Sequence, residues 1–478
     1  MLFNSLDFLI FFPIVFALYT LISEKYKKVL LLFASYYFYM SFSPKYVLLI
    51  IYVTLIAYFT AFGINGTVKK KRKKFWLSTS IVLNLFMLFI FKYFNFFNEI
   101  LVDISSFFSL SYIPFTLNIL LPVGISFFTF QAISYSIDVY RGDKKIESDF
   151  ISFSLFVSFF PQLVAGPIER SKDLLPQFFK PKPLNYYNLR DGFFLAMWGM
   201  FKKVVIADRV GIYVNEVYGN VNEYSGLTLI IATFFFAVQV YADFSGYSDI
   251  AIGIARMLGY KLSLNFNLPY LSKSVSEFWR KWHITLLTWF RDYLFNPIAI
   301  RKRYWGVYAT AYATLITFLL SGLWHGAAWT FVIWGLLHAI ALIYEVFTLK
   351  QRRKWKRKIN KNIYGILSNF LVFCFVNLTY VFFRAETIKD AFYILINSFN
   401  FRLGFQNVNL FNFKSDMTIS IILIFLLFII EVLEKNYHIA SKIMSSNSII
   451  KIFLLLFGVF SIILLGKWEE SAFIYFQF

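Results

Sequence analysis

The sequence predicts an all-α integral membrane protein, and three observations support that prediction. Of its 478 residues, 59% are hydrophobic, 22% are aromatic and only 15% are charged, whereas soluble domains carry about 25% charged residues. Apolar runs close to the roughly 17–25 residues that cross a bilayer recur along the chain. No Pro-, Gly- or Ser-rich linker divides them. We therefore expect a polytopic helical bundle of about ten to twelve spans, with some re-entrant or interfacial helices.

The candidate spans follow one another from the first residues to the last. They are Phe8–Ile22, Val29–Phe42, Tyr46–Ile64, Trp76–Phe97, Leu117–Ile137, Phe193–Val210, Leu227–Tyr241, Tyr308–Leu323, Ala327–Tyr344, Ile366–Phe383, Thr418–Val432 and Ile449–Leu465. Several are short for a full crossing, so they could be tilted, re-entrant or interfacial. The first has no basic residue before it and is interpreted as a retained span, not a signal peptide.

The basic residues cluster between the apolar runs and indicate topology. The net charge is +21, with dense runs at Lys69–Lys74 and Arg352–Lys358. In so apolar a chain these runs follow the positive-inside rule, and we expect no nucleic-acid partner. Lys25 follows the first span, Lys69–Lys74 follow the third, and Arg141 comes two spans later. This spacing predicts an outside N-terminus and cytoplasmic basic loops.

Several kinds of chemistry are disfavoured. Cys374 is the single cysteine, so neither an internal disulfide nor a thiolate metal cage is expected. The chain has no H-x-x-H pair, no Walker A loop, no G-x-G-x-x-G and no G-x-S-x-G. We therefore expect no metal site, and neither ATP-dependent nor serine-hydrolase chemistry.

Polar residues are concentrated in the middle of what we interpret as one membrane-embedded domain, residues 1–478. Residues 1–140 are N-terminal spans, residues 141–345 mix apolar helix with charged, His, Trp, Gly and Pro residues, and residues 346–478 are C-terminal spans. Polar groups at membrane depth are costly and usually face a cavity or a bundle interior. The middle region is therefore expected to hold the chemistry.

Two stretches of this region suggest interruptions or buried charge. Pro161, Gly166 and Pro167 should break a helix that would otherwise run through residues 150–163, giving either a broken segment lining a cavity or an ordinary loop. Asp243 and Asp249 lie in apolar surroundings and are either functional or structural. For the structural alternative, the candidate partners are Arg209, Arg256 and Arg280.

The stretch 269–297 is denser in aromatic and basic residues. If it is helical, one face carries Trp279, His283, Leu286 and Phe290. Glu277 and Lys281 are spaced for an i, i+4 ion pair. The basic residues beside aromatic ones suit an interfacial helix that receives an anionic ligand, or else a membrane-surface helix with snorkelling side chains.

His325 lies between Gly322 and Gly326, whose G-x-x-x-G spacing permits close backbone approach in membranes, and Trp324 precedes it. Burial disfavours the imidazolium, so the ring should stay neutral and could act as a base. It could equally be a hydrogen-bonded structural residue. His338 would lie roughly 20 Å further along a continuous helix, which makes it an improbable direct partner. His438 is interpreted as a surface residue.

Five ordered motifs span nearly the whole chain and are specific as a set. They are Ile125–Tyr135 with Asp138–Gly142, Phe160–Ile168, Asp243–Asp249, Phe278–Thr285 and Gly322–Gly326. Together they strongly resemble the membrane-bound O-acyltransferase (MBOAT) family, in its bacterial branch that contains the alginate O-acetyltransferase. The C-terminal segment Phe473–Phe478 also resembles the ending of that branch.

The resemblance implies helices around a transmembrane tunnel and an enzyme that moves an acyl group from a cytoplasmic donor toward an acceptor on or across the membrane. The essential histidine of the family corresponds to His325, and its other histidine to His283. Acyl transfer needs a base and oxyanion donors, so His325 is the expected general base, with His283 either orienting or relaying a proton or positioning the donor. Arg280, Lys281 and Arg291 are candidate contacts to the phosphates of acetyl-CoA, which would be a substrate and not a bound cofactor.

The remaining polar-motif residues, Asp243, Asp249, Gly322, Gly326 and Trp324, are expected to shape the tunnel. The expected setting is a bacterial inner or plasma membrane, with extracytoplasmic acetyltransferase partners and an alginate-like or other exported polysaccharide as acceptor. Three alternatives stay open: a D-alanyl transferase of teichoic-acid modification, a transporter or channel, and an inactive scaffold. A transporter predicts repeated halves with matched broken helices, and no such repeat is visible in the sequence.

Overall fold

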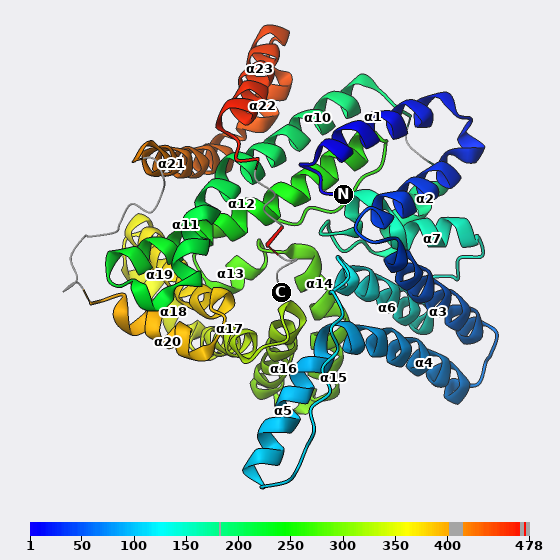
Figure 1. The fold of residues 1–478 in the computed structure, drawn as a ribbon, viewed down its shortest axis with the longest axis horizontal. Helices are drawn as coiled ribbons and strands as arrows, with labels where there is room; N and C mark the ends of the chain where they lie inside the picture. Colours follow the sequence, from blue (N-terminus) through cyan, green and yellow to red (C-terminus); the bar gives the residue numbers. More distant parts are fainter. Residues whose placement is uncertain (181–182, 401–413, 469–472, 475–478) are drawn as a thin grey trace. The chain divides into compact units, whose positions relative to one another are not determined.

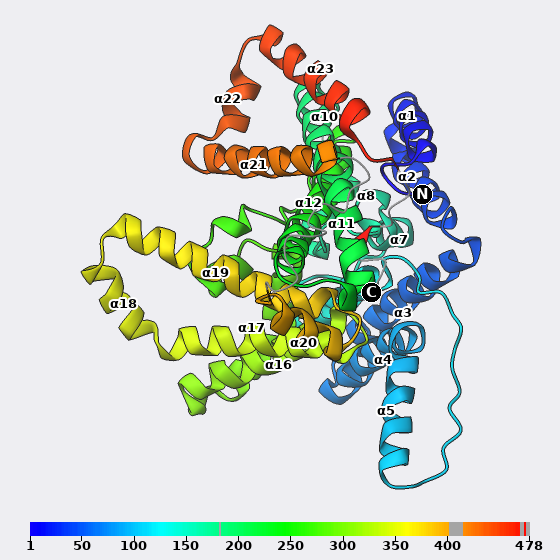
Figure 2. The ribbon, with the colours of Figure 1, turned by 60° about the vertical axis from the view of Figure 1, so that its left-hand side comes forward.

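The computed structural model describes residues 1–180, 183–400, 414–468 and 473–474. Within these residues the regular structure consists of helices, without strands, as Figures 1 and 2 show. The prediction of an all-α fold is confirmed. Side chains begin several of the helices: Ser5, Asp149 and Asn447 each accept a backbone N–H at the starts of α1, α7 and α23, the usual use of Ser, Asp and Asn at helix N-termini.

Figure 1 labels the helices, which are numbered in chain order. The first ten are α1 Leu6–Leu21, α2 Glu24–Met40, α3 Val47–Asn65, α4 Lys70–Leu88, α5 Phe94–Phe107, α6 Ile125–Arg141, α7 Phe150–Ser158, α8 Phe160–Leu163, α9 Ser171–Phe179 and α10 Tyr186–Met200. The others are α11 Asp208–Gly219, α12 Leu227–Met257, α13 Val275–Trp279, α14 Ile284–Phe290, α15 Asn296–Arg301, α16 Val307–His325, α17 Trp329–Phe347, α18 Leu349–Lys358, α19 Lys361–Arg384, α20 Ile388–Asn397, α21 Lys414–Tyr437, α22 Ile439–Ser445 and α23 Ser448–Leu465.

Many of these helices have an apolar outer surface, the reverse of a soluble protein. In α1, Leu6 is 77% exposed, and in α23, Leu464 is 75% exposed. Large exposed hydrophobic side chains also line α3, α4, α19 and α21. Exposed apolar surface on this scale must contact something other than water. The lipid bilayer is that environment.

Eight helices of the described residues are long and apolar enough to cross a membrane, and the shorter α1 is also apolar. The sequence-based expectation was about ten to twelve spans, some of them partial. Two of the expected spans are interrupted. The run 117–137 becomes helical only at Ile125, because Gly124 adopts φ +74° just before α6. The run 193–210 contains a π-helical segment, Phe201–Ala207, that buries Lys202 and Lys203.

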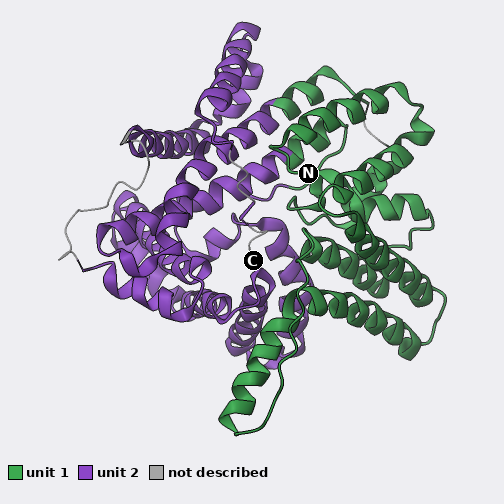
Figure 3. Cartoon of the chain, viewed as in Figure 1, with its two compact units in different colours: residues 1–193, 251–263, 478 green, residues 194–250, 264–477 purple. Residues whose placement is uncertain are grey.

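The described chain forms two compact units, coloured separately in Figure 3: residues 1–193 with 251–263, and residues 194–250 with the described part of 264–477. In the first unit, α3 packs against α4 and α6, and α2 packs against α7. In the second unit, α16 packs along α17 and α17 packs along α19, and α18 connects α17 to α19 (Figure 2).

The predicted break in residues 150–163 lies in the first unit. Helix α7 ends at Ser158, Phe159 leaves the helical conformation with ψ 110°, and α8 covers one further turn. Residues 159–170 are all buried. Glu169 is among them and accepts hydrogen bonds from the backbone N–H and the hydroxyl of Ser263. The segment is therefore a broken helix enclosed by protein, and not a loop on the surface.

Candidate active site

The polypeptide around His283 differs from the continuous helix considered above. Helix α13 ends at Trp279, and His283 has the left-handed backbone φ +42° immediately before α14. A left-handed residue cannot continue a right-handed helix, so Trp279 and His283 do not share one helical face. The expected ion pair within this stretch is confirmed, with Lys281 Nζ 2.7 Å from Glu277 Oε1.

The His283 ring is buried and its protonation is defined by one neighbour. Nδ1 lies 3.0 Å from Asn265 Oδ1. The backbone N–H of Thr285 also donates to this Oδ1 at 3.3 Å, which identifies the atom as the amide carbonyl oxygen. A carbonyl oxygen only accepts, so His283 Nδ1 carries the hydrogen and Nε2 carries the lone pair. Burial lowers the pKa of His283 to about 3, so the ring is neutral at physiological pH.

His325 is the last residue of α16 and is also buried. Its ring centroid lies 4.9 Å from that of Trp324, 4.9 Å from that of Trp334 and 5.3 Å from that of Phe383. Trp324 also contacts the His283 ring, with centroids 6.0 Å apart. The second unit thus brings both predicted histidines into contact with one indole, although α14, α15 and nearly all of α16 lie between them in the sequence.

The close backbone approach predicted from the glycine spacing is confirmed at Gly322. A Cβ there would lie 2.3 Å from the backbone oxygen of Phe331 in α17. At Gly326 a Cβ would lie 2.0 Å from the Phe331 ring. Gly326 has an extended backbone that ends α16, so α17 begins at once and packs back along α16.

His338 has a structural environment, and the distance predicted for it along a continuous helix was wrong because the chain turns at Gly326. Its ring contacts Trp334, which also contacts His325. Trp279 Nε1–H donates to His338 Nδ1 at 3.2 Å, and His338 Nε2 lies 3.1 Å from Thr379 Oγ1. Both ring nitrogens are therefore engaged. His438 is exposed, as predicted.

Asp243 and Asp249 pair with lysines, so the arginine partners suggested from the sequence were wrong. Lys203 Nζ lies 2.9 Å from Asp243 Oδ1, and Lys202 Nζ lies 2.7 Å from Asp249 Oδ2. Asp243 Oδ2 also accepts the backbone N–H of Ile474 at 2.9 Å. These contacts make both aspartates structural anchors of the second unit.

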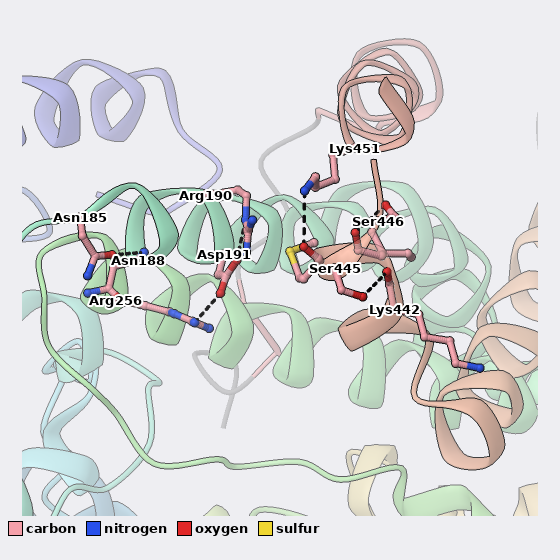
Figure 4. A network of polar contacts seen from close by, with 11 residues as sticks. Asn185, Asn188, Arg190, Asp191, Arg256, Lys442, Ser445, Ser446 and Lys451 are labelled. Carbon is pink, nitrogen blue, oxygen red and sulfur yellow. Dashed lines mark hydrogen bonds and ion pairs between the residues drawn. The ribbon is translucent and has the colours of Figure 1, made fainter. Parts of the chain in front are cut away.

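The proposed arginines have other partners. Arg209 pairs with Asp416, Arg280 donates to Ser276 Oγ, and Arg256 pairs with Asp191, which also binds Arg190 in Figure 4. Backbone packing explains why the lysines reach α12 instead. A Cβ at Gly199 would lie 2.4 Å from the backbone oxygen of Gly246. This close approach brings the π-helical segment that follows Gly199 beside α12.

The second unit also contains a basic cavity of about 720 Å³. Arg280 and Arg291 line it, as a donor-binding role would require, whereas Lys281 is not among its lining residues. Its other basic side chains were not singled out as site residues from the sequence. They are Lys273, Arg352, Arg353, Lys356 and Lys361.

One wall of the cavity is organised by Glu345 of α17. Its carboxylate accepts the backbone N–H groups of Val275 and Ser276 at 2.9 and 3.0 Å and pairs with Arg352 at 3.1 Å. Trp279 and Phe318 form an apolar part of the wall. The Trp279 ring contacts Trp334, which in turn contacts His325.

These histidine motifs lie within a recognised family. The model of the membrane-bound O-acyltransferase family matches residues 31–384. The chain belongs to this family. Residues 31–384 include both histidines, the basic cavity and the Lys–Asp pairs. The protein is therefore a membrane acyltransferase.

Relatives of known name refine the comparison. The chain is 39% identical to a probable alginate O-acetylase AlgI of Pseudomonas aeruginosa, over 84% of this chain and 75% of that protein. It is 36% identical to a peptidoglycan O-acetyltransferase of Helicobacter pylori, over 83% and 79%. It is 28% identical to a teichoic acid D-alanyltransferase of Bacillus subtilis, over 56% and 70%. The sequence identity to the two O-acetylating enzymes is thus higher than that to the D-alanyltransferase, and it extends over more of this chain.

Sequence reasoning missed three groups of polar residues in the second unit of this acyltransferase. Asn265 was missed because a single Asn in a loop carries no pattern. Lys202 and Lys203 were included in an apolar run and treated as part of a span. The cavity residues of α18 were interpreted only as topology markers. They come together with Arg280 only because the chain turns back between α17 and α19, and the sequence does not show that turn.

Proposed function

We propose that this acyltransferase moves acetyl groups from cytoplasmic acetyl-CoA toward the O-acetylation of an exported or cell-surface polysaccharide, with alginate-like glycans as the first candidate. The arrangement that carries the proposal is the pair of buried histidines in contact with Trp324. The setting we propose is a bacterial inner or plasma membrane, with the basic loops in the cytoplasm. Extracytoplasmic acetyltransferase proteins would complete delivery to the glycan.

The reaction needs few groups. The acceptor hydroxyl oxygen attacks the thioester carbonyl carbon, and His325 takes the hydroxyl proton as general base. The ester C–O bond forms, the C–S bond breaks, and the proton passes to the departing thiolate. His283, neutral and holding its lone pair on Nε2, orients or relays a proton in the same step. A dry aromatic environment strengthens such polar interactions.

The basic cavity supports a phosphate-bearing donor. Its lining has seven Lys and Arg side chains against two carboxylates, Glu277 and Glu345. Arg guanidinium groups, which donate paired N–H bonds, and Lys ammonium groups are the usual ligands of phosphate oxygens. A nucleotide thioester such as acetyl-CoA carries phosphates at one end and the acyl group at the other. The D-alanyl alternative is less favoured because the likeness to D-alanyltransferases is lower and covers less of this chain.

The test compares His325→Ala with His438→Ala in cells that lack the native enzyme. A general base contributes about 10²–10⁴-fold to such a step, so His325→Ala should remove ester-linked acetate from the surface glycan at an unchanged membrane level of protein. His438 is exposed, and its variant should retain acetylation.

Full acetylation by His325→Ala, with expression confirmed by immunoblot, would contradict the general-base role. Ester-linked alanine in place of acetate in wild-type cells would instead favour the D-alanyl alternative.

A further inference from the structure

Asn265 lies in the loop between α12 and α13 and is completely buried. Its backbone oxygen accepts the N–H of Ile284 at 2.9 Å, and the N–H of Asn267 donates to the oxygen of Lys281 at 2.9 Å. These two hydrogen bonds lie on either side of His283, whose left-handed backbone is uncommon for a residue with a side chain. The loop therefore holds the turn that presents the imidazole.

The Asn265 side chain is bonded at both ends. Its Oδ1 accepts from His283 Nδ1 at 3.0 Å and from the N–H and Oγ1–H of Thr285 at 3.3 and 2.9 Å. Its Nδ2 donates to Ser248 Oγ of α12 at 3.2 Å. Because the Thr285 N–H can only donate, the amide cannot be flipped without placing two donors against each other.

This arrangement selects one of the two neutral forms of His283. The form with hydrogen on Nδ1 gains the bond to Asn265, whereas the form with hydrogen on Nε2 would face the carbonyl lone pairs with its own lone pair. The bond made by one imidazole nitrogen sets the role of the other nitrogen. The structure also aligns the ring, because Phe244 contacts it edge-on with centroids 4.6 Å apart.

We propose that Asn265 is a positioning residue for acyl transfer, whose carbonyl oxygen holds His283 in the Nδ1–H form and so reserves Nε2 as the nitrogen that accepts a proton or hydrogen bond during the reaction. This inference rests on the proposed function. Thr285 and Ser248 hydrogen-bond the Asn265 side chain and support its amide group.

The experiment measures label transfer from radiolabelled acetyl-CoA to polysaccharide in membrane vesicles from acetylating cells that carry the full chain. Asn265→Leu removes the acceptor, so kcat should fall by about 100-fold or more, within the range of general acid–base effects, while KM for acetyl-CoA changes by less than about two-fold. Thr285→Val and Ser248→Ala keep Asn265 Oδ1 and should retain most of the activity.

Asn265→Asp is the conservative variant and keeps the measurement informative if Asn265→Leu does not accumulate in the membrane. Its carboxylate still accepts from Nδ1–H, so activity should persist at alkaline pH. The added negative charge favours the imidazolium, so activity should fall on acidification at a pH where the wild type is unaffected.

Three results would overturn the positioning role: high activity in Asn265→Leu, an Asn265→Asp variant with no change in its pH profile, or Thr285→Val losing as much activity as Asn265→Leu. If His325→Ala is inactive while Asn265→Leu is active, only this inference fails. If His325→Ala is active, the proposed function fails independently of Asn265.

Discussion

The three buried histidines, His283, His325 and His338, differ in what their rings contact. His338 has a donor at Nδ1 and a hydroxyl at Nε2, so it bridges Trp279 and Thr379 and stabilises packing. His283 donates a hydrogen bond from Nδ1–H to Asn265 Oδ1. His325 is surrounded by aromatic rings at a helix end. Burial alone would not separate these roles, because all three side chains are buried.

The cavity allows a residue-scale prediction with a matched control. Arg353 and Lys356 of α18 line the cavity, whereas Lys354 and Arg357 of the same helix are not among its lining residues. Hydrogen bonds to charged groups contribute about 1.5–3 kcal/mol each. The double variant Arg353→Ala/Lys356→Ala should therefore raise KM for acetyl-CoA by about ten-fold or more, with kcat little changed.

Steady-state kinetics on membrane vesicles would measure this, with Lys354→Ala/Arg357→Ala as the control. Both double variants remove two positive charges from α18, so a general electrostatic attraction would weaken both equally. Equal increases of KM in the two variants would show that the cavity does not bind the donor.

Among individual residues, the sequence predicted types of side chain better than their partners. His325 was singled out for its glycine setting and its match to the family's essential histidine, and Arg280 and Arg291 as basic side chains suited to phosphate in an aromatic stretch. The partner of Asp249 could not be predicted. Lys202 reaches it because a π-helical segment follows the contact of Gly199 with Gly246, and so rare an insertion was not expected in an apolar run.

The α16–α17 hairpin is the element that places His325. Gly322 and Gly335 face each other across it, since a Cβ at Gly335 would lie 2.2 Å from the backbone oxygen of Phe318 and 3.4 Å from Gly322 Cα. This reciprocal approach leaves no room for a methyl group on either helix. The G-x-x-x-G spacing was enough to predict the approach at Gly322, although its partner helix could not be read from that spacing.

The hairpin yields an element-scale prediction. In Gly322→Ala the new Cβ would lie 2.3 Å from the Phe331 oxygen, so the helices must separate. Overpacking typically costs about 1–3 kcal/mol, and we expect a lower Tm of the detergent-solubilised protein together with reduced acetyl transfer. Gly219→Ala is the control, because nothing lies within 4 Å of a Cβ at that position. A Tm equal to that of the wild type for Gly322→Ala would contradict the close packing.

The break between α13 and α14 is a feature of the helices that the sequence pattern did not predict. Apolar and aromatic residues continue through residues 275–290 at helical spacing, with no Gly or Pro to interrupt them. The helix nevertheless ends because backbone hydrogen bonds from the loop containing Asn265 hold the turn at His283. A tertiary contact thus overrides local propensity, which is a weak determinant over so short a segment.

At the scale of the whole molecule, the apolar exterior and the positions of basic residues together predict a topology. The helix α3 has 19 residues, a length of about 28 Å at ~1.5 Å per residue, close to the ~30 Å hydrocarbon core. Lys45 precedes this helix and Lys70 follows it, and both are exposed. A membrane-spanning α3 places these two lysines on opposite sides. From the positive-inside rule we predict that Lys69–Lys74 lie on the cytoplasmic side.

That assignment predicts the labelling of single cysteines in a Cys374→Ser background. In intact spheroplasts, an impermeant maleimide should modify Lys45→Cys but not Lys70→Cys, and permeabilisation should expose Lys70→Cys. Each variant serves as the control for the other, since both replace an exposed lysine, one before α3 and one after it. Labelling of Lys70→Cys in intact spheroplasts would reverse the orientation, and the basic cluster would then require a role other than cytoplasmic retention. Equal labelling of both positions would show that α3 does not cross the bilayer, because one crossing must separate its two ends.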